Sequence, residues 1–187
     1  MTSNPWPNLP PFTSAGVLPP RDYFLTLSEL MQSHLVTGLP GAPATWDAAW
    51  RGRLVQNLDI LIRQLWQLGI TEIYVDGSFV EEKDHPNDID GYFECDPRYL
   101  ASGQLESHLN ALDPHQCWTW DWARRRPDPN SGKAQLPMWF HYHVELYPHI
   151  GQPSGITDRY GQPLQFPSAF RLSRQAFTPK GIVKIVR

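Results

Sequence analysis

The sequence predicts an α+β protein in which helices cover one side of a mixed β-sheet. A long leucine stripe predicts an amphipathic helix over residues 45–68. Shorter apolar runs at 70–76 and 88–95 have the length and composition of strands. The order of these elements, in which two strands follow a helix and are followed by another helix and further strands, is typical of a sheet backed by helices.

The N-terminal half is predicted to contain a proline-rich arm followed by two helices. Residues 1–20 hold six prolines, which lack backbone donors, so residues 1–22 are expected to lie on the surface or to be disordered. Thr26-Leu27-Ser28-Glu29 fits a capping box and begins a short helix that runs to about Val36. The helix at 45–68 ends before Gly69, which suits the position after a helix.

Residues 23–187 are predicted to form one domain, whose second half adds a helix and three strands. The leucines of 98–112 fall on one side and predict a helix. Residues 117–122 alternate Trp with Cys, Thr and Asp, and residues 138–147 alternate apolar with polar side chains, so both are interpreted as strands. From about residue 150 we expect an irregular C-terminal extension that ends in a strand at 181–186.

Composition and charge narrow the classes of partner. The formal charge of −3 gives no basic field over the whole molecule, so a non-specific grip on nucleic acid is not expected. Local basic patches are still possible in two places, at 124–126 and at Lys180, Lys184 and Arg187. No apolar run approaches the ~20 residues that span a bilayer and no signal peptide is visible, so we expect a cytoplasmic protein without membrane contact. Cys95 and Cys117 are expected to be buried free thiols.

The stretch 73–94 carries the residues that point to chemistry. An apolar run ends in Gly77-Ser78, and after nine intervening residues the chain reads Asp88-Ile89-Asp90. Two Asp at i and i+2 on a strand project to one face and repel unless a cation lies between them, and Mg²⁺ prefers carboxylate oxygens. The glycine-led turn offers backbone N–H groups to an anion. A metal site beside a phosphate site predicts phosphoryl or nucleotidyl transfer.

Two other interpretations fit the acidic pair less well. Asn-Asp and Asp-Gly are turn formers, so the pair could lie in a solvated turn, and the sequence leaves this alternative open. An EF-hand loop would open in a similar way, but its twelfth residue here is Tyr99 rather than Glu, and the glycine is misplaced. The EF-hand interpretation is therefore excluded.

Gly77-Ser78, the spacing to Asp88-Ile89-Asp90 and the apolar Tyr92-Phe93 that follow resemble the signature of the DNA polymerase beta-like nucleotidyltransferase superfamily. The spacing is closest to that of minimal bacterial nucleotidyltransferases of the toxin–antitoxin type. The flanks, including 16–20 and 179–183, resemble an uncharacterised bacterial family of this type. The resemblance implies the polymerase beta-like fold and an Mg²⁺-dependent transfer of a nucleoside monophosphate from an NTP to an acceptor hydroxyl.

The resemblance also implies roles for individual residues. Asp88 and Asp90 would hold two Mg²⁺ ions. Gly77 and Ser78 would bind the β- and γ-phosphates, with Lys83 adding positive charge. Acceptors that the resemblance allows are protein side chains, the tRNA 3′ end and small molecules, and the mild negative charge slightly favours a protein.

The superfamily takes a third carboxylate from a later strand, and two residues compete for this role. Glu145 is the preferred candidate because it lies on the polar face of the strand predicted at 138–147. It departs from the more common Asp, and its longer reach loosens metal geometry. Asp121, opposite the tryptophan face of 117–122, is the competing candidate.

Other polar residues of the same predicted strand suggest weaker alternatives. His141 and His143 would share a face with Glu145, with His149 nearby, and such a set suits a zinc-dependent hydrolase or a general base, although strand histidines are more often ordinary polar residues. Trp139, on this face, is a candidate to stack on a nucleobase. The main alternative of another class is a catalytically silent nucleotidyltransferase-fold module that binds a partner or a nucleotide.

Overall fold

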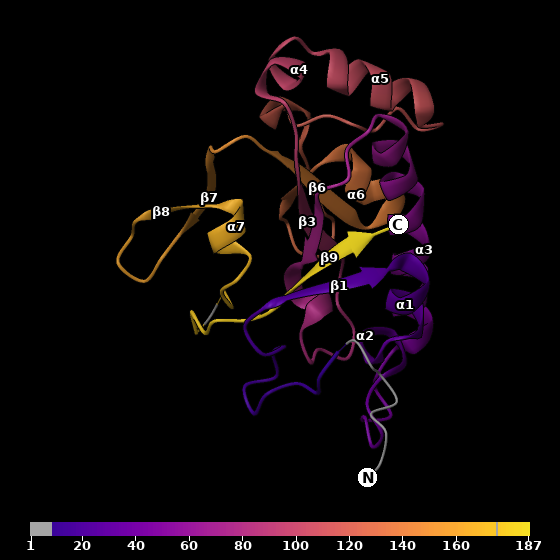
Figure 1. Ribbon diagram of the computed structural model, residues 1–187, viewed down its shortest axis with the longest axis vertical. Coiled ribbons are helices and arrows are strands. Elements are labelled where there is room, and N and C mark those ends of the chain that lie inside the picture. The colour runs from indigo at the N-terminus through magenta and orange to yellow at the C-terminus, as the bar shows by residue number, and fades with distance from the viewer. Residues whose placement is uncertain (1–8, 175) are drawn as a thin grey trace.

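The computed structural model describes residues 9–174 and 176–187, and its centre is one five-stranded mixed sheet (Figure 1). In spatial order the strands are β1 (Asp22–Thr26), β9 (Ile182–Val186), β2 (Ile73–Asp76), β3 (Ile89–Glu94) and β6 (Val144–His149). β1 is parallel to β9 and β3 is parallel to β6, whereas β2 is antiparallel to both β9 and β3. The predicted α+β class with a mixed sheet is confirmed.

Helices cover one face of this sheet. They are α1 (Leu27–Gln32), α2 (His34–Thr37), α3 (Ala48–Gln67), α5 (Gln104–Leu112) and α6 (Pro137–Tyr142). Their apolar side chains form one core with alternate strand residues, such as Ile73 and Val75 of β2. Burial of apolar surface is the main favourable term in folding. The apolar face of each strand therefore packs against the helices, and the other face points away from them.

The opposite face is covered over only part of its area. The hairpin of β7 (Pro153–Thr157) and β8 (Pro163–Gln165) and the short helix α7 (Phe166–Ala169) lie on this side and project beyond the sheet (Figure 1). Phe166 packs against Tyr92 of β3 in a smaller second core. The region after residue 150, expected to be irregular, therefore contains regular elements.

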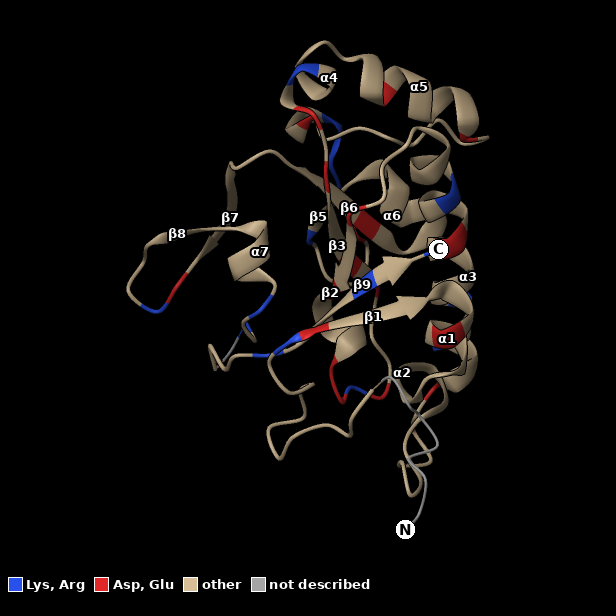
Figure 2. Ribbon diagram, viewed as in Figure 1, with Lys and Arg blue, Asp and Glu red and all other residues tan. Residues whose placement is uncertain are grey.

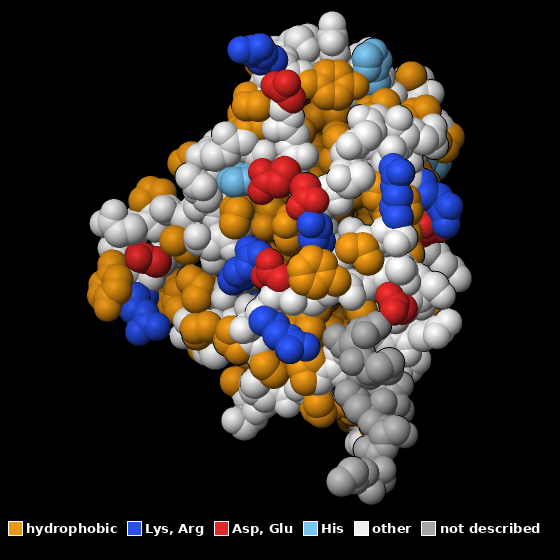
Figure 3. Space-filling view, in the orientation of Figure 1, with side chains coloured by type: hydrophobic (Ala, Val, Ile, Leu, Met, Phe, Trp, Pro, Cys, Tyr) orange, Lys and Arg blue, Asp and Glu red, His pale blue; other side chains and the backbone are white. Residues whose placement is uncertain are grey.

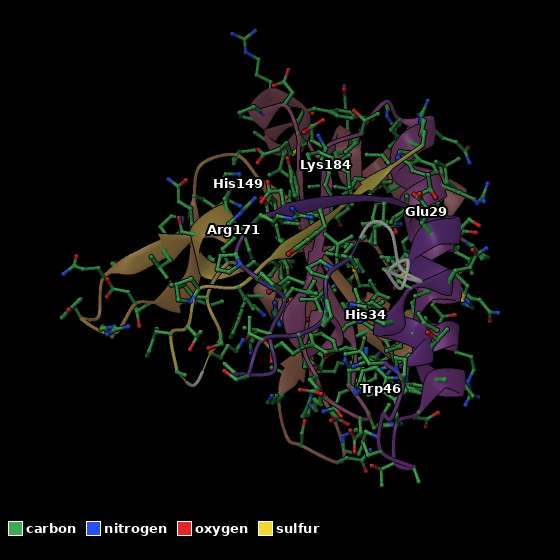
Figure 4. The ribbon with its side chains drawn as sticks, turned by 60° about the horizontal axis from the view of Figure 1, so that its bottom comes forward. Glu29, His34, Trp46, His149, Arg171 and Lys184 are labelled. Carbon is green, nitrogen blue, oxygen red and sulfur yellow. The ribbon has the colours of Figure 1, made fainter. Side chains whose placement is uncertain are left out.

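Arg171 connects α7 to the sheet. Its guanidinium donates hydrogen bonds to the Asp22 carboxylate at 2.8 Å and to the Tyr92 hydroxyl at 3.3 Å. Figure 4 shows Arg171 and His149 on the side of β7 and α7, away from His34 and Trp46, which lie toward the helices. The partly covered face is thus held by a polar contact as well as by aromatic packing.

The predicted helices are largely confirmed. Thr26 caps α1 through a complete capping box with Glu29. The leucine stripe forms α3. Gly103 adopts a left-handed conformation (φ 72°) and divides the helix expected at 98–112 into α4 (Pro97–Ala101) and α5.

The strand predicted at 138–147 is wrong in its first half. Pro137 begins α6 instead, because its fixed φ suits the first helical position. The buried side of this helix contains Met138, Trp139 and Tyr142, whose spacing is helical and not alternating. His143 then takes a left-handed conformation (φ 52°), and β6 begins at Val144.

The strand predicted at 117–122 is also wrong. In the structure as described these residues belong to no strand. Trp118 is fully buried, Trp120 donates Nε1–H to the carbonyl of Leu146 at 2.8 Å, and Trp122 is 75% exposed. The three tryptophans therefore do not share one face, and the last of them begins the turn η2 (Trp122–Arg124). A short hairpin of β4 (Arg126–Pro127) and β5 (Ala134–Gln135) follows.

Both ends of the described chain are built into the domain, contrary to prediction. Residues 1–8 of the predicted arm lie outside the described residues, but Leu9, Val17 and Leu18 are buried. Leu18 also accepts a backbone hydrogen bond from Gly181 at 2.9 Å. Because β9 lies between β1 and β2, the residues after 150 complete the central sheet and are not an appended extension.

Two further expectations concern cysteines and membranes. Cys95 and Cys117 are free thiols, of which Cys117 is buried and Cys95 is half-buried. Within the described ranges, no helix combines the length and the apolar character needed to cross a bilayer.

Candidate functional site

Three carboxylates form a row across three neighbouring strands. Asp76 of β2 pairs with Asp90 of β3, and Asp90 in turn pairs with Glu145 of β6. Val75 and Ile89, which alternate with them, point into the core under the helices, so the acidic row lies on the opposite, partly covered face. Like charges at this spacing are unfavourable unless positive charge accompanies them.

Gly77 brings the predicted phosphate turn against this row. It follows β2 directly, opens the turn η1 (Gly77–Val80) and has a φ of 76°. A Cβ atom at Gly77 would lie 2.5 Å from Oδ2 of Asp90, which is closer than two such atoms can approach. Both the positive φ and the close approach of Asp90 therefore favour glycine at this position. The structure thus brings together Gly77, Ser78 and Asp90, as the sequence predicted.

Asp90 lies in a strongly electronegative setting. Its side chain is half-buried, and burial, followed by the charge of Asp88, raises the pKa of Asp90 to about 8. Glu145 and Asp76 raise this pKa further, while the positive charge of Arg174 opposes the shift. Negative charge therefore outweighs positive charge at the position where the sequence predicts a metal ion.

Asp88 precedes β3 by one residue and is oriented by a tryptophan. Trp139 of α6, which is 7% exposed, donates its Nε1–H to Oδ2 of Asp88 at 2.9 Å. Trp139 therefore fixes the carboxylate from the helix side. Its predicted place on the polar face of a strand is wrong, because residue 139 lies in a helix.

Glu145 lies beside Asp90 in the sheet, but its carboxylate oxygens already have partners within the protein. Oε1 accepts a hydrogen bond from the backbone N–H of Leu136 at 2.6 Å, and Oε2 accepts one from the hydroxyl of Tyr147 at 2.6 Å. The guanidinium of Arg125 lies 3.8 Å from Oε1. Burial raises the pKa of Glu145, and these partners oppose that rise.

The competing carboxylate, Asp121, has a different role. Its side chain is exposed and accepts a hydrogen bond from the backbone N–H of Ala123 at 2.9 Å, which caps η2. Asp121 precedes η2 and belongs to none of the strands of the acidic row. Between the two candidates, the strand register places only Glu145 beside Asp90.

The donor set fits a hard divalent cation in part. Asp88 and Asp90 supply carboxyl oxygens, the ligands that Mg²⁺ prefers, and Asp90 would release its proton when the ion binds. Glu145, held by Leu136 and Tyr147, would have to turn to become a third ligand. Within residues 9–174 and 176–187, no group of three or more His, Cys, Asp or Glu side chains is arranged to hold a metal ion.

The turn after Gly77 is held from the helix side by Arg51. This α3 residue is fully buried, and its guanidinium donates to the carbonyls of Phe79, Glu81 and Lys83 at 2.8, 3.1 and 2.5 Å. Lys83 itself is exposed, and only its backbone takes part in these contacts. The structure therefore gives the Lys83 side chain no contact with the turn.

A second buried cation, Lys180, holds the turn from the other side, whereas its sequence context predicts only a local basic patch. The ammonium of Lys180 donates to Glu81 at 2.6 Å and lies 3.1 Å from Oδ1 of Asp76. Figure 2 shows basic residues in the segment that leads into β9, close to acidic strand ends. The sequence signal for Lys180 is its place in Pro179-Lys180-Gly181, directly before an apolar strand.

The histidines do not form the predicted cluster. His141 lies in α6 and is exposed, and its ring stacks on that of His115 with centroids 4.3 Å apart. His143 ends this helix and makes an edge contact with Trp50. His149 lies in β6 and contacts Glu94 at 2.9 Å. His141 and His143 therefore share no strand face with Glu145, and the zinc-hydrolase alternative loses its geometric basis.

Comparison with known proteins gives one match. No curated protein and no solved structure matches the chain. A family of unknown function, DUF6932, matches residues 10–186, which include every element of the central sheet and all of the candidate site residues. The chain therefore belongs to this family of unknown function.

Proposed function

We propose that this protein is a metal-dependent nucleotidyltransferase with the polymerase beta-like fold. The observation that carries the proposal is the contact between Gly77 and Asp90, which has no room for a Cβ atom. This contact supports the proposal because the turn that would bind the phosphates lies directly against the carboxyl group of Asp90, which would bind the cation. A triphosphate with its divalent cation requires this combination, because the cation and the phosphates must be bound side by side.

The proposed reaction is attack of an acceptor hydroxyl oxygen on the α-phosphorus of an NTP. A new P–O bond forms to the acceptor, the bond to the β-phosphate oxygen breaks, pyrophosphate leaves with the bonding electron pair, and the hydroxyl proton is released. Bound Mg²⁺, two ions by the resemblance, would neutralise phosphate charge and favour the deprotonated acceptor. Asp88 and Asp90 would hold it, and Gly77 and Ser78 would position the β- and γ-phosphates through the turn.

Glu145 is proposed as the third carboxylate, and it could also serve as the base that takes the hydroxyl proton. Burial raises the pKa of Glu145, which favours proton uptake. Lys83 has only a peripheral role in this proposal, since its side chain is exposed. Lys180 and Arg51 are the cations that contact the turn.

The acceptor is proposed to be a protein side-chain hydroxyl rather than an RNA end. The net charge is −3, and on the face shown in Figure 3 basic and acidic side chains lie next to one another without a single-sign patch. Such a surface gives no general attraction for a polyanion. Action on a protein partner within a toxin–antitoxin or defence module is consistent with this choice.

The proposal is tested by incubating the protein with each α-labelled NTP, Mg²⁺ and a cell extract. We expect covalent label on an acceptor, and we expect its loss in the double variant Asp88→Asn, Asp90→Asn. Asp59→Asn is a matched control, because Asp59 forms only an exposed ion pair with Arg63 on α3. Label transfer by the double variant at the wild-type rate would exclude the mechanism.

A silent nucleotide-binding module is the second candidate, and one observation favours it. Both oxygens of Glu145 already accept hydrogen bonds, and Arg125 lies beside them. A module of this kind would bind Mg²⁺–NTP through Asp88 and Asp90 but transfer nothing. Tight binding of Mg²⁺–NTP without label transfer to any acceptor would support it over the enzyme.

A further inference from the structure

We infer that Lys180 is a positioning residue that fixes the Gly77-Ser78 turn for a triphosphate, an inference that rests on the proposed function. Lys180 lies two residues before β9, and its backbone N–H donates to the carbonyl of Arg171. Its side chain is only 3% exposed, so it is not a surface charge. The residue comes from a part of the chain that supplies none of the proposed ligands.

The ammonium of Lys180 contacts the turn at both ends. It lies 3.1 Å from Oδ1 of Asp76, the residue before the turn, and donates to Oε1 of Glu81, the residue after it, at 2.6 Å. It also donates to the backbone carbonyl of Gly77 at 3.3 Å. One cation therefore fixes the start, the end and the first peptide of the segment that would contact the phosphates.

Stability alone does not account for such an arrangement. A buried ion pair contributes little to stability, because removal of its charges from water costs about as much as their attraction returns. Arg51, from the helix side, already binds the carbonyls of Phe79, Glu81 and Lys83. Two buried cations thus hold one short segment, as expected for a turn whose N–H groups must be aligned before an anion binds.

Lys180 also changes how the acidic row can be used. It neutralises Asp76, which is the neighbour of Asp90 in the sheet register. The contacts of Lys180 are with Asp76, Glu81 and Gly77, and Asp88 and Asp90 are not among them. A divalent cation would therefore bind Asp88 and Asp90 and not Asp76. In this way Lys180 keeps the metal position apart from the start of the turn.

The test compares Lys180→Met with Lys184→Met. Lys184 is a matched control, because it lies four positions later and pairs with Glu72 at 2.6 Å, away from the turn. Binding of α,β-methylene analogues of ATP, GTP, CTP and UTP with Mg²⁺ is measured by calorimetry. We expect Lys180→Met to weaken binding by roughly 10–100-fold, as loss of outer-shell partners does, and Lys184→Met to leave it unchanged.

A double variant separates positioning from folding. Lys180→Met alone leaves Asp76 and Glu81 without their cation, whereas Asp76→Asn, Lys180→Met removes the buried pair together. We expect the double variant to recover thermal stability but not affinity, because the Gly77 carbonyl and the Glu81 side chain still lack the ammonium of Lys180. Recovery of affinity together with stability in the double variant would overturn the inference.

Hydrogen exchange of the ligand-free protein provides a readout that does not depend on the proposed function. Backbone amides of 77–83 are expected to exchange faster in Lys180→Met and in the double variant, and at the wild-type rate in Lys184→Met. If the wild-type protein bound none of the four analogues, the proposed function would fail, and exchange would still show whether Lys180 fixes the turn. Unchanged exchange of 77–83 in the double variant would refute the positioning role.

Discussion

The indole of Trp139 donates a hydrogen bond to Oδ2 of Asp88 at 2.9 Å and so joins α6 to the first carboxylate of the candidate site. A side chain from a helix thereby sets the orientation of a residue at the start of a strand. Neutral hydrogen-bond donors that orient metal ligands act through geometry and not through charge. Trp139 is therefore expected to affect the chemistry more than the fold.

Trp139→Phe should reduce label transfer about 10-fold or more while it lowers the free energy of unfolding by only ~1 kcal/mol, since the aromatic packing is kept and one hydrogen bond is lost. Trp66→Phe is the control, because the buried Nε1 of Trp66 has no partner among the described residues. Initial rates of label transfer check the loss of activity, and urea unfolding checks the change in the free energy of unfolding. Equal effects of the two variants would contradict a role for Trp139 in orienting Asp88.

Gly77→Ala should abolish nucleotide binding and lower the free energy of unfolding by ~1–3 kcal/mol, because a side chain at positive φ is strained and its Cβ meets Asp90. Gly69→Ala isolates the strain, since Gly69 has a φ of 78° with open space around its Cβ position. Urea unfolding should show a larger loss of stability for Gly77→Ala than for Gly69→Ala. Calorimetry with Mg²⁺–NTP should show a larger loss of affinity for Gly77→Ala as well. A fully active Gly77→Ala protein would rule out the close contact.

Asp90→Asn should stabilise the metal-free protein at alkaline pH. The folded protein raises the pKa of Asp90 to about 8, so between pH ~4 and ~8 the folded state keeps a proton that the unfolded state has released. Stability is therefore lost as pH rises through this window, and asparagine avoids the loss. We expect no difference near pH 4 and a gain in the free energy of unfolding that grows as the pH approaches ~8 in chelator, measured by urea unfolding.

Magnesium provides the control for this pH dependence. Mg²⁺ should stabilise the wild-type protein at pH 8 by binding the charged form of Asp90, and it should stabilise Asp90→Asn less. A variant that gains stability equally at pH 4 and pH 8 would show that the effect arises from packing and not from the charge of Asp90.

Glu145→Gln should separate the enzyme from the silent module. Glutamine keeps an acceptor for the backbone N–H of Leu136 and a donor toward the Tyr147 oxygen, so the free energy of unfolding should change by less than ~1 kcal/mol. Label transfer should nevertheless fall about 100-fold or more if Glu145 is the third carboxylate. Asp121→Asn, which alters only an exposed cap, should retain transfer. Label transfer by Glu145→Gln at the wild-type rate would show that Glu145 is not the third carboxylate and that Asp88 and Asp90 act without it.

The centre of the site was predictable because it is local in sequence. Gly77, Asp88 and Asp90 belong to one β2–turn–β3 unit, so their spacing already implies contact. Glu145 could be chosen because a polar residue in an apolar strand marks a face, although its strand begins later than predicted. The place of Glu145 beside Asp90 then follows from the pairing of β3 with β6.

The anchors of the site were not predictable, for two physical reasons. Lys180 contacts residues about one hundred positions earlier, and a lone lysine before a strand carries no pattern that names such a partner. The sequence predicts a strand around Trp139 because the apolar residues of 138–142 suit both a strand and a helix, but Pro137 favours the helix. Long-range contacts and ambiguous periodicity thus hid the residues that hold the site in place.

The position of β9 between β1 and β2 has a consequence for how the protein matures in the cell. β1 leaves the ribosome early, yet its partner in the sheet is synthesised after nearly all the rest of the domain. Until then β1 and β2 are unpaired edges that invite aggregation, and the turn lacks its lysine. A nascent chain that stalls before β9 would therefore be a target for chaperones and proteases, and no truncated product could carry a formed site.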